Sequence, residues 1–268
     1  MKILKAVFHL LFAAVWTAVL ALTACLAILV RWDSGAAIWW ARHVWSPGMM
    51  WIGGIDIEVS GRENVDPKRP TIYAVNHASS IDIPVSFIAL PVNFRYVAKS
   101  QLRWVPILGW TLWIAKFVFV DRSNRAKAIA SLEAAGRRIR NGISIVVHPE
   151  GTRSANGRIL PFKKGPFALA LKARVPICPV TIEGSARIMP KNSWFISSGK
   201  VKVKIGAPID VTEYGEHERE RLAHDVRAVI IRQSIELGGL GGDVDDAVAA
   251  AGVEGVGAPR EPLRKTAS

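Results

Sequence analysis

The chain has 268 residues, which fits one globular domain with a substantial core and one additional segment. Half of the residues are hydrophobic, and the mean hydropathy of +0.22 is high for a water-soluble protein. The formal charge of +13 suits nucleic acid, anionic lipid or acidic small molecules as a partner. Ten Trp residues beside a hydrophobic segment favour a membrane surface over nucleic acid, because Trp prefers the lipid headgroup region.

The two cysteines exclude a disulfide framework. Cys25 and Cys178 both lie in apolar runs, and neither has the spacing of a metal or redox motif. The histidines other than His77 also do not pair at ligand spacing, so we expect no metal site.

The N-terminal segment is apolar enough to enter a membrane. After Lys2 and Lys5, residues 7–30 contain no Asp, Glu, Lys or Arg. About 20 such residues cross the hydrocarbon core. A cleaved signal peptide is the alternative, but its apolar part is shorter and is followed by a polar start. We therefore expect a retained membrane anchor.

The next stretch, residues 36–55, is rich in Trp but also contains Arg42 and the pair Pro47-Gly48. Arginine is costly at the bilayer centre, and Pro-Gly is expected to break a spanning helix. We therefore predict an interfacial or half-inserted segment, and we assign residues 1–56 to the anchor.

From residue 57 to 237 the pattern is that of an α/β domain. Short apolar runs predict strands at residues 71–76, 94–98, 117–120, 144–148, 178–182 and 201–205. Amphipathic patterns predict helices at 124–140 and 216–237. Such alternation indicates a central sheet, mostly parallel or mixed, flanked by helices. Residues 238–268 are rich in Gly and Ala, and we expect a disordered tail.

The first chemical motif directly follows a predicted strand. It consists of Asn76, His77 and, five residues after the His, Asp82. A His beside an Asp can act as a general base, because the carboxylate fixes the tautomer and stabilises the imidazolium. The alternative is that His77 only bonds a loop while Asp82 caps a helix. No nucleophile motif accompanies the pair, so direct attack by a substrate hydroxyl is the simpler scheme.

Other polar groups follow further predicted strands. The run His-Pro-Glu-Gly-Thr-Arg-Ser occupies residues 148–154, and its Gly permits a tight turn while its Arg suits a phosphate. Asp121 and Arg122 end another strand, and Lys99 ends a fourth. Because the ends of such strands converge on one edge of a sheet, these groups are expected to meet there.

The order and spacing of these blocks resemble the glycerolipid acyltransferase family, which includes 1-acylglycerol-3-phosphate acyltransferases. The family patterns match as follows: Asn-His-x-x-x-x-Asp at 76–82, Asp-Arg at 121–122, Pro-Glu-Gly-Thr-Arg-Ser at 149–154 and Val-Pro-Ile-x-Pro-Val at 175–180. The resemblance covers roughly residues 57–208. His148 departs from the pattern, since the family usually has Phe there, and we expect it to be packed in its neutral form.

The resemblance implies roles for the matched residues. His77 would deprotonate the acceptor hydroxyl, and Asp82 would orient His77. The residues implied to hold the acceptor's phosphate and glycerol are Glu150, Gly151, Thr152, Arg153, Arg122 and Lys99. The fourth block would line part of the acyl or acceptor pocket.

The resemblance also implies the substrates: 1-acylglycerol-3-phosphate as the lysophospholipid acceptor, acyl-CoA or acyl carrier protein as the donor, and phosphatidic acid as the product, with no metal or redox cofactor. Thioester donors place the catalytic domain on the cytoplasmic face of the membrane. A re-entrant or two-crossing anchor satisfies this, whereas one crossing from a cytoplasmic N-terminus does not.

Two alternatives stay open from the sequence. The same chemistry could act on glycerol-3-phosphate, a lyso-ornithine lipid or another lysophospholipid. A non-catalytic membrane protein that binds anionic lipid through a basic face would share the composition.

Overall fold

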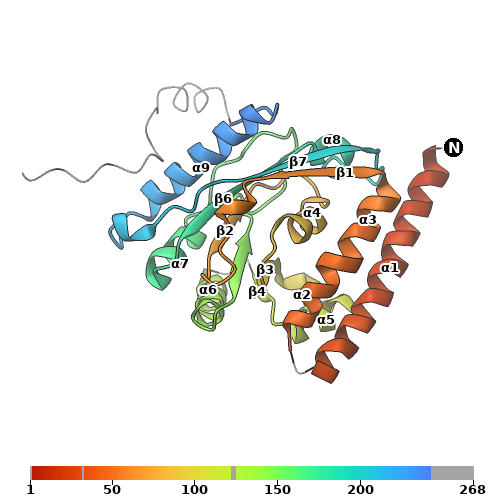
Figure 1. The fold of residues 1–268 in the computed structure, drawn as a ribbon, viewed down its shortest axis with the longest axis horizontal. Helices are drawn as coiled ribbons and strands as arrows, with labels where there is room; N and C mark the ends of the chain where they lie inside the picture. Colours follow the sequence, from red (N-terminus) through yellow and green to blue (C-terminus); the bar gives the residue numbers. More distant parts are fainter. Residues whose placement is uncertain (1, 32, 122–124, 243–268) are drawn as a thin grey trace, which may run out of the picture.

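The protein combines an N-terminal helical hairpin with one mixed sheet that carries helices on both faces (Figure 1). The structure, a computed structural model, describes residues 2–31, 33–121 and 125–242. The expected α/β class with a helical N-terminal segment is confirmed.

The sheet has seven strands in the order β1-β7-β6-β2-β5-β3-β4. The strands are β1 Ile55–Ser60, β2 Ile72–Val75, β3 Phe94–Lys99, β4 Val118–Val120, β5 Ser144–Val147, β6 Ile177–Glu183 and β7 Gly199–Ile205. Strands β6, β2, β5, β3 and β4 run parallel, whereas β7 is antiparallel to β6 and pairs in parallel with β1. All six predicted strands are present. The seventh, β1, was not predicted.

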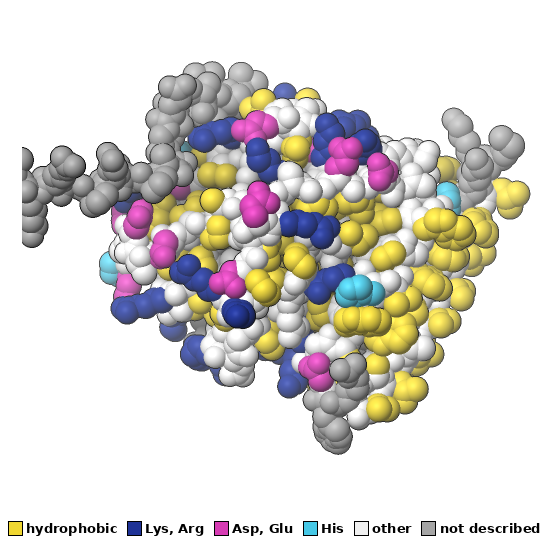
Figure 2. Space-filling view, viewed as in Figure 1, with side chains coloured by type: hydrophobic (Ala, Val, Ile, Leu, Met, Phe, Trp, Pro, Cys, Tyr) yellow, Lys and Arg dark blue, Asp and Glu magenta, His cyan; other side chains and the backbone are white. Residues whose placement is uncertain are grey.

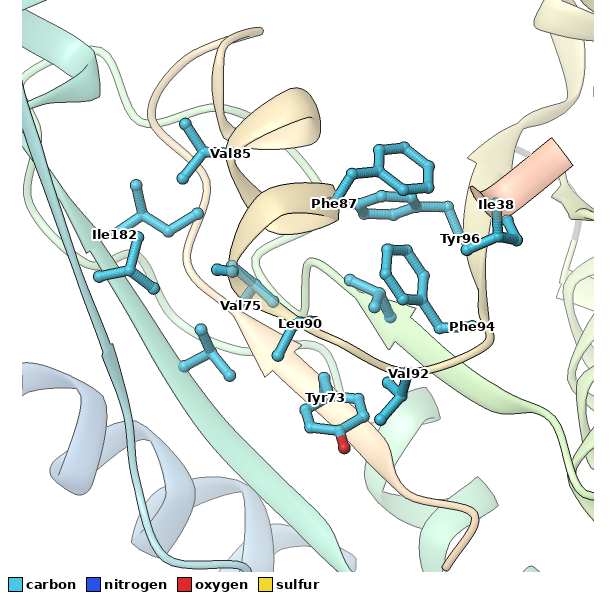
Figure 3. Packing of buried hydrophobic residues seen from close by; sticks show 14 of the residues in the cluster. Ile38, Tyr73, Val75, Val85, Phe87, Leu90, Val92, Phe94, Tyr96 and Ile182 are labelled. Atoms are coloured by element: carbon cyan, nitrogen blue, oxygen red, sulfur yellow. The ribbon is translucent and has the colours of Figure 1, made fainter. Parts of the chain in front are cut away.

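The central strand β2 separates two hydrophobic clusters, because successive side chains of a strand point to opposite faces. Tyr73 and Val75 belong to one cluster, and Ile72 and Ala74 belong to the other. Figure 3 shows Tyr73 and Val75 with Phe94 among the packed side chains of the first cluster. Every residue of β2 is buried, so packing fixes the backbone position from which the following residues leave the sheet.

Different helices cover the two faces. One face packs against α6 Arg125–Arg140, α7 Gly165–Ala173 and α9 Arg219–Glu236. The other packs against α4 Asp82–Ala89 and the N-terminal hairpin. The shorter helices are η2 Arg62–Asn64, η3 Ser100–Trp104, α5 Leu108–Ile114, α8 Ser185–Ile188 and η4 Val211–Glu213.

The hairpin consists of α1 Lys2–Arg31 and a returning helix formed by α2 Gly35–Trp40, η1 Ala41–Trp45 and α3 Ser46–Gly53. The prediction that Pro47-Gly48 breaks this helix is wrong. A π-helical turn, η1, widens the backbone before Pro47, which lies in the first turn of α3, where its missing N–H is tolerated. The indole of Trp16 donates to the carbonyl of Trp45 in that wide turn at 3.2 Å.

Arg42 binds backbone carbonyls of the domain. Its guanidinium donates to the carbonyls of Phe87 (3.1 Å) and Leu90 (2.8 Å), and also to that of Val92. Since α4 ends at Ala89, these bonds satisfy carbonyls at the end of that helix. The argument from the cost of a buried charge therefore does not apply, because the protein itself supplies the acceptors.

Helix α1 has one apolar face buried and another exposed. Residues Ala6–Ile28 are long and apolar enough to cross a membrane, and 22 % of the most apolar window is buried, which is low for a core helix. The exposed side chains recur at helical spacing: Leu4, Val7, Phe8, Leu11, Val15, Val19, Leu22, Leu26 and Val30. Figure 2 shows hydrophobic side chains gathered along the side of α1, and charged ones on the opposite side.

Residues 238–242, expected to begin a disordered tail, are hydrogen-bonded to the domain. The N–H of Gly239 donates to Ser234, and the carbonyl of Gly241 accepts from the N–H of Ile159, both at 2.8 Å. Residues 243–268 lie outside the described part of the chain.

Gly48→Ala should destabilise the protein, whereas Gly136→Ala should be neutral or stabilising. A Cβ at residue 48 would lie 2.6 Å from the ring of Trp16. Relieving such an overlap costs about 1–3 kcal/mol. In α6, a Cβ at residue 136 would meet Leu169 at 3.5 Å, an ordinary contact, and Ala favours a helix over Gly by about 0.5–1 kcal/mol.

Thermal unfolding of the full chain in detergent measures both variants. An unchanged midpoint in Gly48→Ala protein would mean that the two helices separate at no cost.

Candidate active site

His77 follows the central strand at its carboxyl end. The side-chain amide of Asn76 donates to the carbonyl of Ile182 (2.9 Å) and accepts from the N–H of the same residue (2.7 Å). These two bonds join the end of β2 to β6, where the chain leaves the sheet. The residue after Asn76 is therefore held at the sheet edge where functional groups of α/β proteins gather.

The His77–Asp82 pair forms as predicted from the sequence. His77 Nδ1 lies 2.9 Å from Asp82 Oδ2, and the same oxygen accepts from the N–H groups of Ala78 and Ser79, each at 2.8 Å. The turn 77–82 ends at Asp82, the first residue of α4, so a spacing of five brings the two side chains together. Because an ionised carboxylate only accepts, the proton lies on Nδ1 and the lone pair on Nε2.

Burial separates the two partners. The side chain of Asp82 is 1 % exposed and that of His77 is 16 % exposed. Burial alone would raise the pKa of Asp82, but the hydrogen bonds from His77 and the backbone outweigh it and hold the pKa below its ordinary value. The carboxylate therefore stays charged beneath the ring, and the ring reaches solvent.

Glu150 holds the backbone beneath His77. Its Oε1 accepts from the N–H of His77 (2.7 Å), and its Oε2 accepts from the N–H of Leu160 (3.0 Å). The side chain is buried, and burial raises its pKa to about 7. The family resemblance led us to expect that Glu150 contacts the acceptor. Its two oxygens instead bind the backbone of two other segments.

The turn after Glu150 brings the third sequence block against the first. Gly151 has a φ of +74°, a conformation that favours glycine. The N–H of Ser154 donates to the carbonyl of His77 at 2.7 Å, and the guanidinium of Arg153 donates to Ser80 Oγ at 3.0 Å. Thr152 is exposed beside them. These residues thus lie around the loop that carries His77.

Two of the expected residues belong to neighbouring strands. Lys99 is exposed at the carboxyl end of β3, two strands from β2 and at the same edge of the sheet. Asp121 follows β4, the next strand. Arg122 lies outside the described residues.

Comparison with known proteins agrees with this geometry. The acyltransferase family model matches residues 56–183. A 1-acyl-sn-glycerol-3-phosphate acyltransferase of Cocos nucifera is 35 % identical over 188 residues, covering 70 % of this chain and 59 % of that protein. The alpha form of Mus musculus is 34 % identical over 193 residues, with 70 % and 68 % covered. The chain belongs to this acyltransferase family.

A solved structure extends the similarity to the fold. The crystal structure of the 1-acyl-sn-glycerophosphate acyltransferase PlsC from Thermotoga maritima matches with a TM-score of 0.77 and 28 % identity. The match covers 89 % of this chain and 97 % of that one. The plant relatives are longer, since the chain spans 59 % of the Cocos nucifera protein and 66 % of a Limnanthes alba enzyme of the same name.

The protein has a second histidine packed against the first. The rings of His148 and His77 stack with centroids 4.0 Å apart and an angle of 12°, and Tyr96 also stacks on His148, at 5.5 Å. His148 Nδ1 lies 3.0 Å from the carbonyl of Val75. Burial lowers the pKa of His148 to about 3, so the ring is neutral, as the sequence led us to expect.

The fourth sequence block does not line a pocket. Most of it lies in β6, where every residue is buried between β2 and β7. Cys178 and Val180 belong to the hydrophobic core. Its alternating Pro and apolar residues thus reflect a central strand, and the expectation of an acyl or acceptor pocket there is corrected.

We predict that His148 destabilises the protein in acid. Its ordinary pKa of 6.5 falls to about 3 on folding, so between these values the unfolded chain binds the extra proton and stability falls as the pH falls. One such proton contributes a slope of at most about 1.4 kcal/mol per pH unit. His148→Phe keeps a ring in the stack and removes this slope.

Unfolding free energies of both proteins, measured from pH 7.5 to 4.5, test this through their difference. Glu150, whose raised pKa has the opposite effect, is common to both and cancels. A difference that does not vary with pH would contradict a neutral, buried His148.

Proposed function

We propose that this acyltransferase moves a fatty acyl group from acyl-CoA or acyl carrier protein to the free sn-2 hydroxyl of 1-acylglycerol-3-phosphate and forms phosphatidic acid. The observation that carries the proposal is the buried Asp82 bound to a solvent-facing His77. Curated relatives named for this reaction, at about a third identity over 70 % of the chain, support the choice of substrate.

The proposed reaction is a single acyl transfer. His77 Nε2 takes the proton from the acceptor hydroxyl as its oxygen attacks the thioester carbonyl. Asp82 stabilises the imidazolium that forms, in the way a carboxylate supports a catalytic His elsewhere. The tetrahedral intermediate collapses with loss of the thiolate, which receives the proton back from His77. These steps call for no metal or redox cofactor.

The acceptor's phosphate is assigned to the turn after Glu150. Arg153 donates to Ser80, three residues after His77, and Thr152 precedes it in the chain and is exposed. Arg can hold phosphate oxygens with parallel hydrogen bonds. We propose Lys99, at the carboxyl end of β3, as a further contributor, and Arg122 from the Asp-Arg block that the family resemblance matches. Gly151 supplies the turn and Glu150 supports it.

The exposed face of α1 is proposed to lie in the membrane lipid, with the α/β domain on the cytoplasmic face, where thioester donors occur. An apolar stripe of this length suits burial in a bilayer. Because α2–α3 runs back along α1 to β1, both ends of the hairpin lie on the same side of the molecule (Figure 1). The hairpin could therefore dip into one leaflet from the side of the α/β domain. The lysophospholipid then reaches the site from the bilayer.

His77→Ala should lower turnover by about 10²–10⁴-fold, the usual contribution of a general base. Asp82→Asn should cost less if the Asp only orients and stabilises the ring. Transfer of labelled acyl-CoA to lysophosphatidate in mixed micelles measures both, and the thermal midpoint of each variant checks its fold. Near-full activity in His77→Ala protein would contradict the proposed mechanism.

Substituting the exposed stripe should release the protein from membranes. Deleting the hairpin would be a poor test, because it also covers one face of the sheet. The triple variant Leu11→Gln, Val15→Gln, Leu22→Gln changes side chains that are 53–62 % exposed and should keep the fold. Flotation with anionic vesicles in high salt should show less bound protein.

The matched control is Ile235→Gln on α9, where a 48 % exposed apolar residue lies outside the hairpin. It should bind vesicles as the wild type does. Full binding by the triple variant would move the membrane contact elsewhere.

A further inference from the structure

A lysine that no sequence block contains lies against the phosphate-binding turn. Lys191 Nζ donates to the carbonyl of Arg153 at 2.7 Å and lies 3.4 Å from Thr152 Oγ1. The residue is half-buried and follows α8. An ammonium group has three N–H donors, so these contacts leave one for a ligand.

The loop that carries Lys191 is fixed to the active site. Ser79, two residues after His77, donates through its hydroxyl to the carbonyl of Met189 at 2.8 Å. The N–H of Ser193 donates to the carbonyl of Pro190 at 3.0 Å, which closes a turn with Lys191 at its corner. Asn192 takes the positive φ, +65°, that this turn needs, a conformation Asn tolerates. The position of Lys191 is therefore set before any ligand binds, which reduces the entropy lost on binding.

Positive charge is in excess around this turn. Within the described part of the chain, neither Arg153 nor Lys191 forms an ion pair with a carboxylate. The side chain of Lys163 adds a third cation beside Gly151, where its Cγ would lie 3.5 Å from an added Cβ. Among the described contacts, neither Asp82 nor Glu150 binds Arg153 or Lys191. Asp82 is bound to His77 and the backbone, and burial raises the pKa of Glu150 to about 7.

We propose that Lys191 and Arg153 together bind the phosphate monoester of the acceptor, one cation from each of two loops. A phosphate monoester carries close to two negative charges at neutral pH, which two cations match. In 1-acylglycerol-3-phosphate the phosphate and the free hydroxyl are on adjacent carbons, so cations close to His77 place that hydroxyl at the base. This inference rests on the proposed function and names a determinant of its acceptor specificity.

Kinetics of the full chain in mixed micelles test the proposal. Lys191→Ala should raise the KM for lysophosphatidate about 10-fold, the loss expected for one charge-assisted hydrogen bond. The KM for acyl-CoA and the thermal midpoint should not change. Arg153→Ala should give the same pattern, and Lys191→Arg should recover most of the affinity. Lys172→Ala, which removes an exposed lysine of α7, is the control and should match the wild type.

A merely structural role for Lys191 gives a different result. Lys191→Gln can still donate to the carbonyl of Arg153 but has no charge. If the Gln variant restored the acceptor KM, or if both KM values rose together, Lys191 would only tether the turn and the proposal would fail. An equal loss in Lys172→Ala protein would assign the effect to overall charge.

Binding measured without a donor separates this inference from the proposed function. Calorimetry with dodecyl phosphate should show weaker binding to Lys191→Ala protein than to the wild type, even if lysophosphatidate proves not to be the acceptor. Inorganic phosphate should bind much more weakly than dodecyl phosphate. Equal affinity for the two would overturn the assignment to a lipid headgroup, and equal binding of dodecyl phosphate by both proteins would overturn the role of Lys191.

Discussion

The position of the His77 backbone is the constraint on which the site depends. Its N–H donates to Glu150 and its carbonyl accepts from Ser154, so both polar backbone groups of the residue are bonded to the loop after β5. Its side chain is held by Asp82 through Nδ1 and by the ring of His148 from one face. Chain direction, tautomer and ring plane are thus fixed by different partners. Only Nε2 of His77 is left free of these partners, and it is the atom that a substrate can approach.

This arrangement explains why the acceptor site and the base belong together. The loop that orients His77 is the loop that carries Thr152 and Arg153, so a shift of one moves the other. A substrate held by that turn keeps its distance to the base even if the loop moves as a unit. Positioning of reacting groups contributes heavily to catalysis, and a rigid link between the two is one way to preserve it.

Much of this architecture could be predicted from the sequence, for identifiable reasons. Buried strands appear as apolar runs, and polar groups that directly follow them converge at one sheet edge, so the pairing of His77 with Asp82 could be anticipated. The partners of Glu150 could not. The resemblance implied a substrate contact, whereas Glu150 binds backbone N–H groups, and a local motif does not show which backbone groups lie close in space. The prediction that Pro47-Gly48 breaks the helix was wrong for a related reason. Locally the pair breaks a helix, but a π turn and the indole of Trp16 accommodate it.

The electrostatics of the site follow from where its carboxylates are buried. A negative charge near the base favours the imidazolium, yet it would also repel the phosphate of an acceptor bound next to His77. Asp82 avoids this conflict because its charge faces His77 and two backbone N–H groups beneath the ring. Glu150 lessens it because burial raises its pKa to about 7, so only part of the carboxyl population is charged at neutral pH. Among the described contacts, neither Arg153 nor Lys191 pairs with a carboxylate, so both cations stay available to a dianionic headgroup while Asp82 and Glu150 support the base.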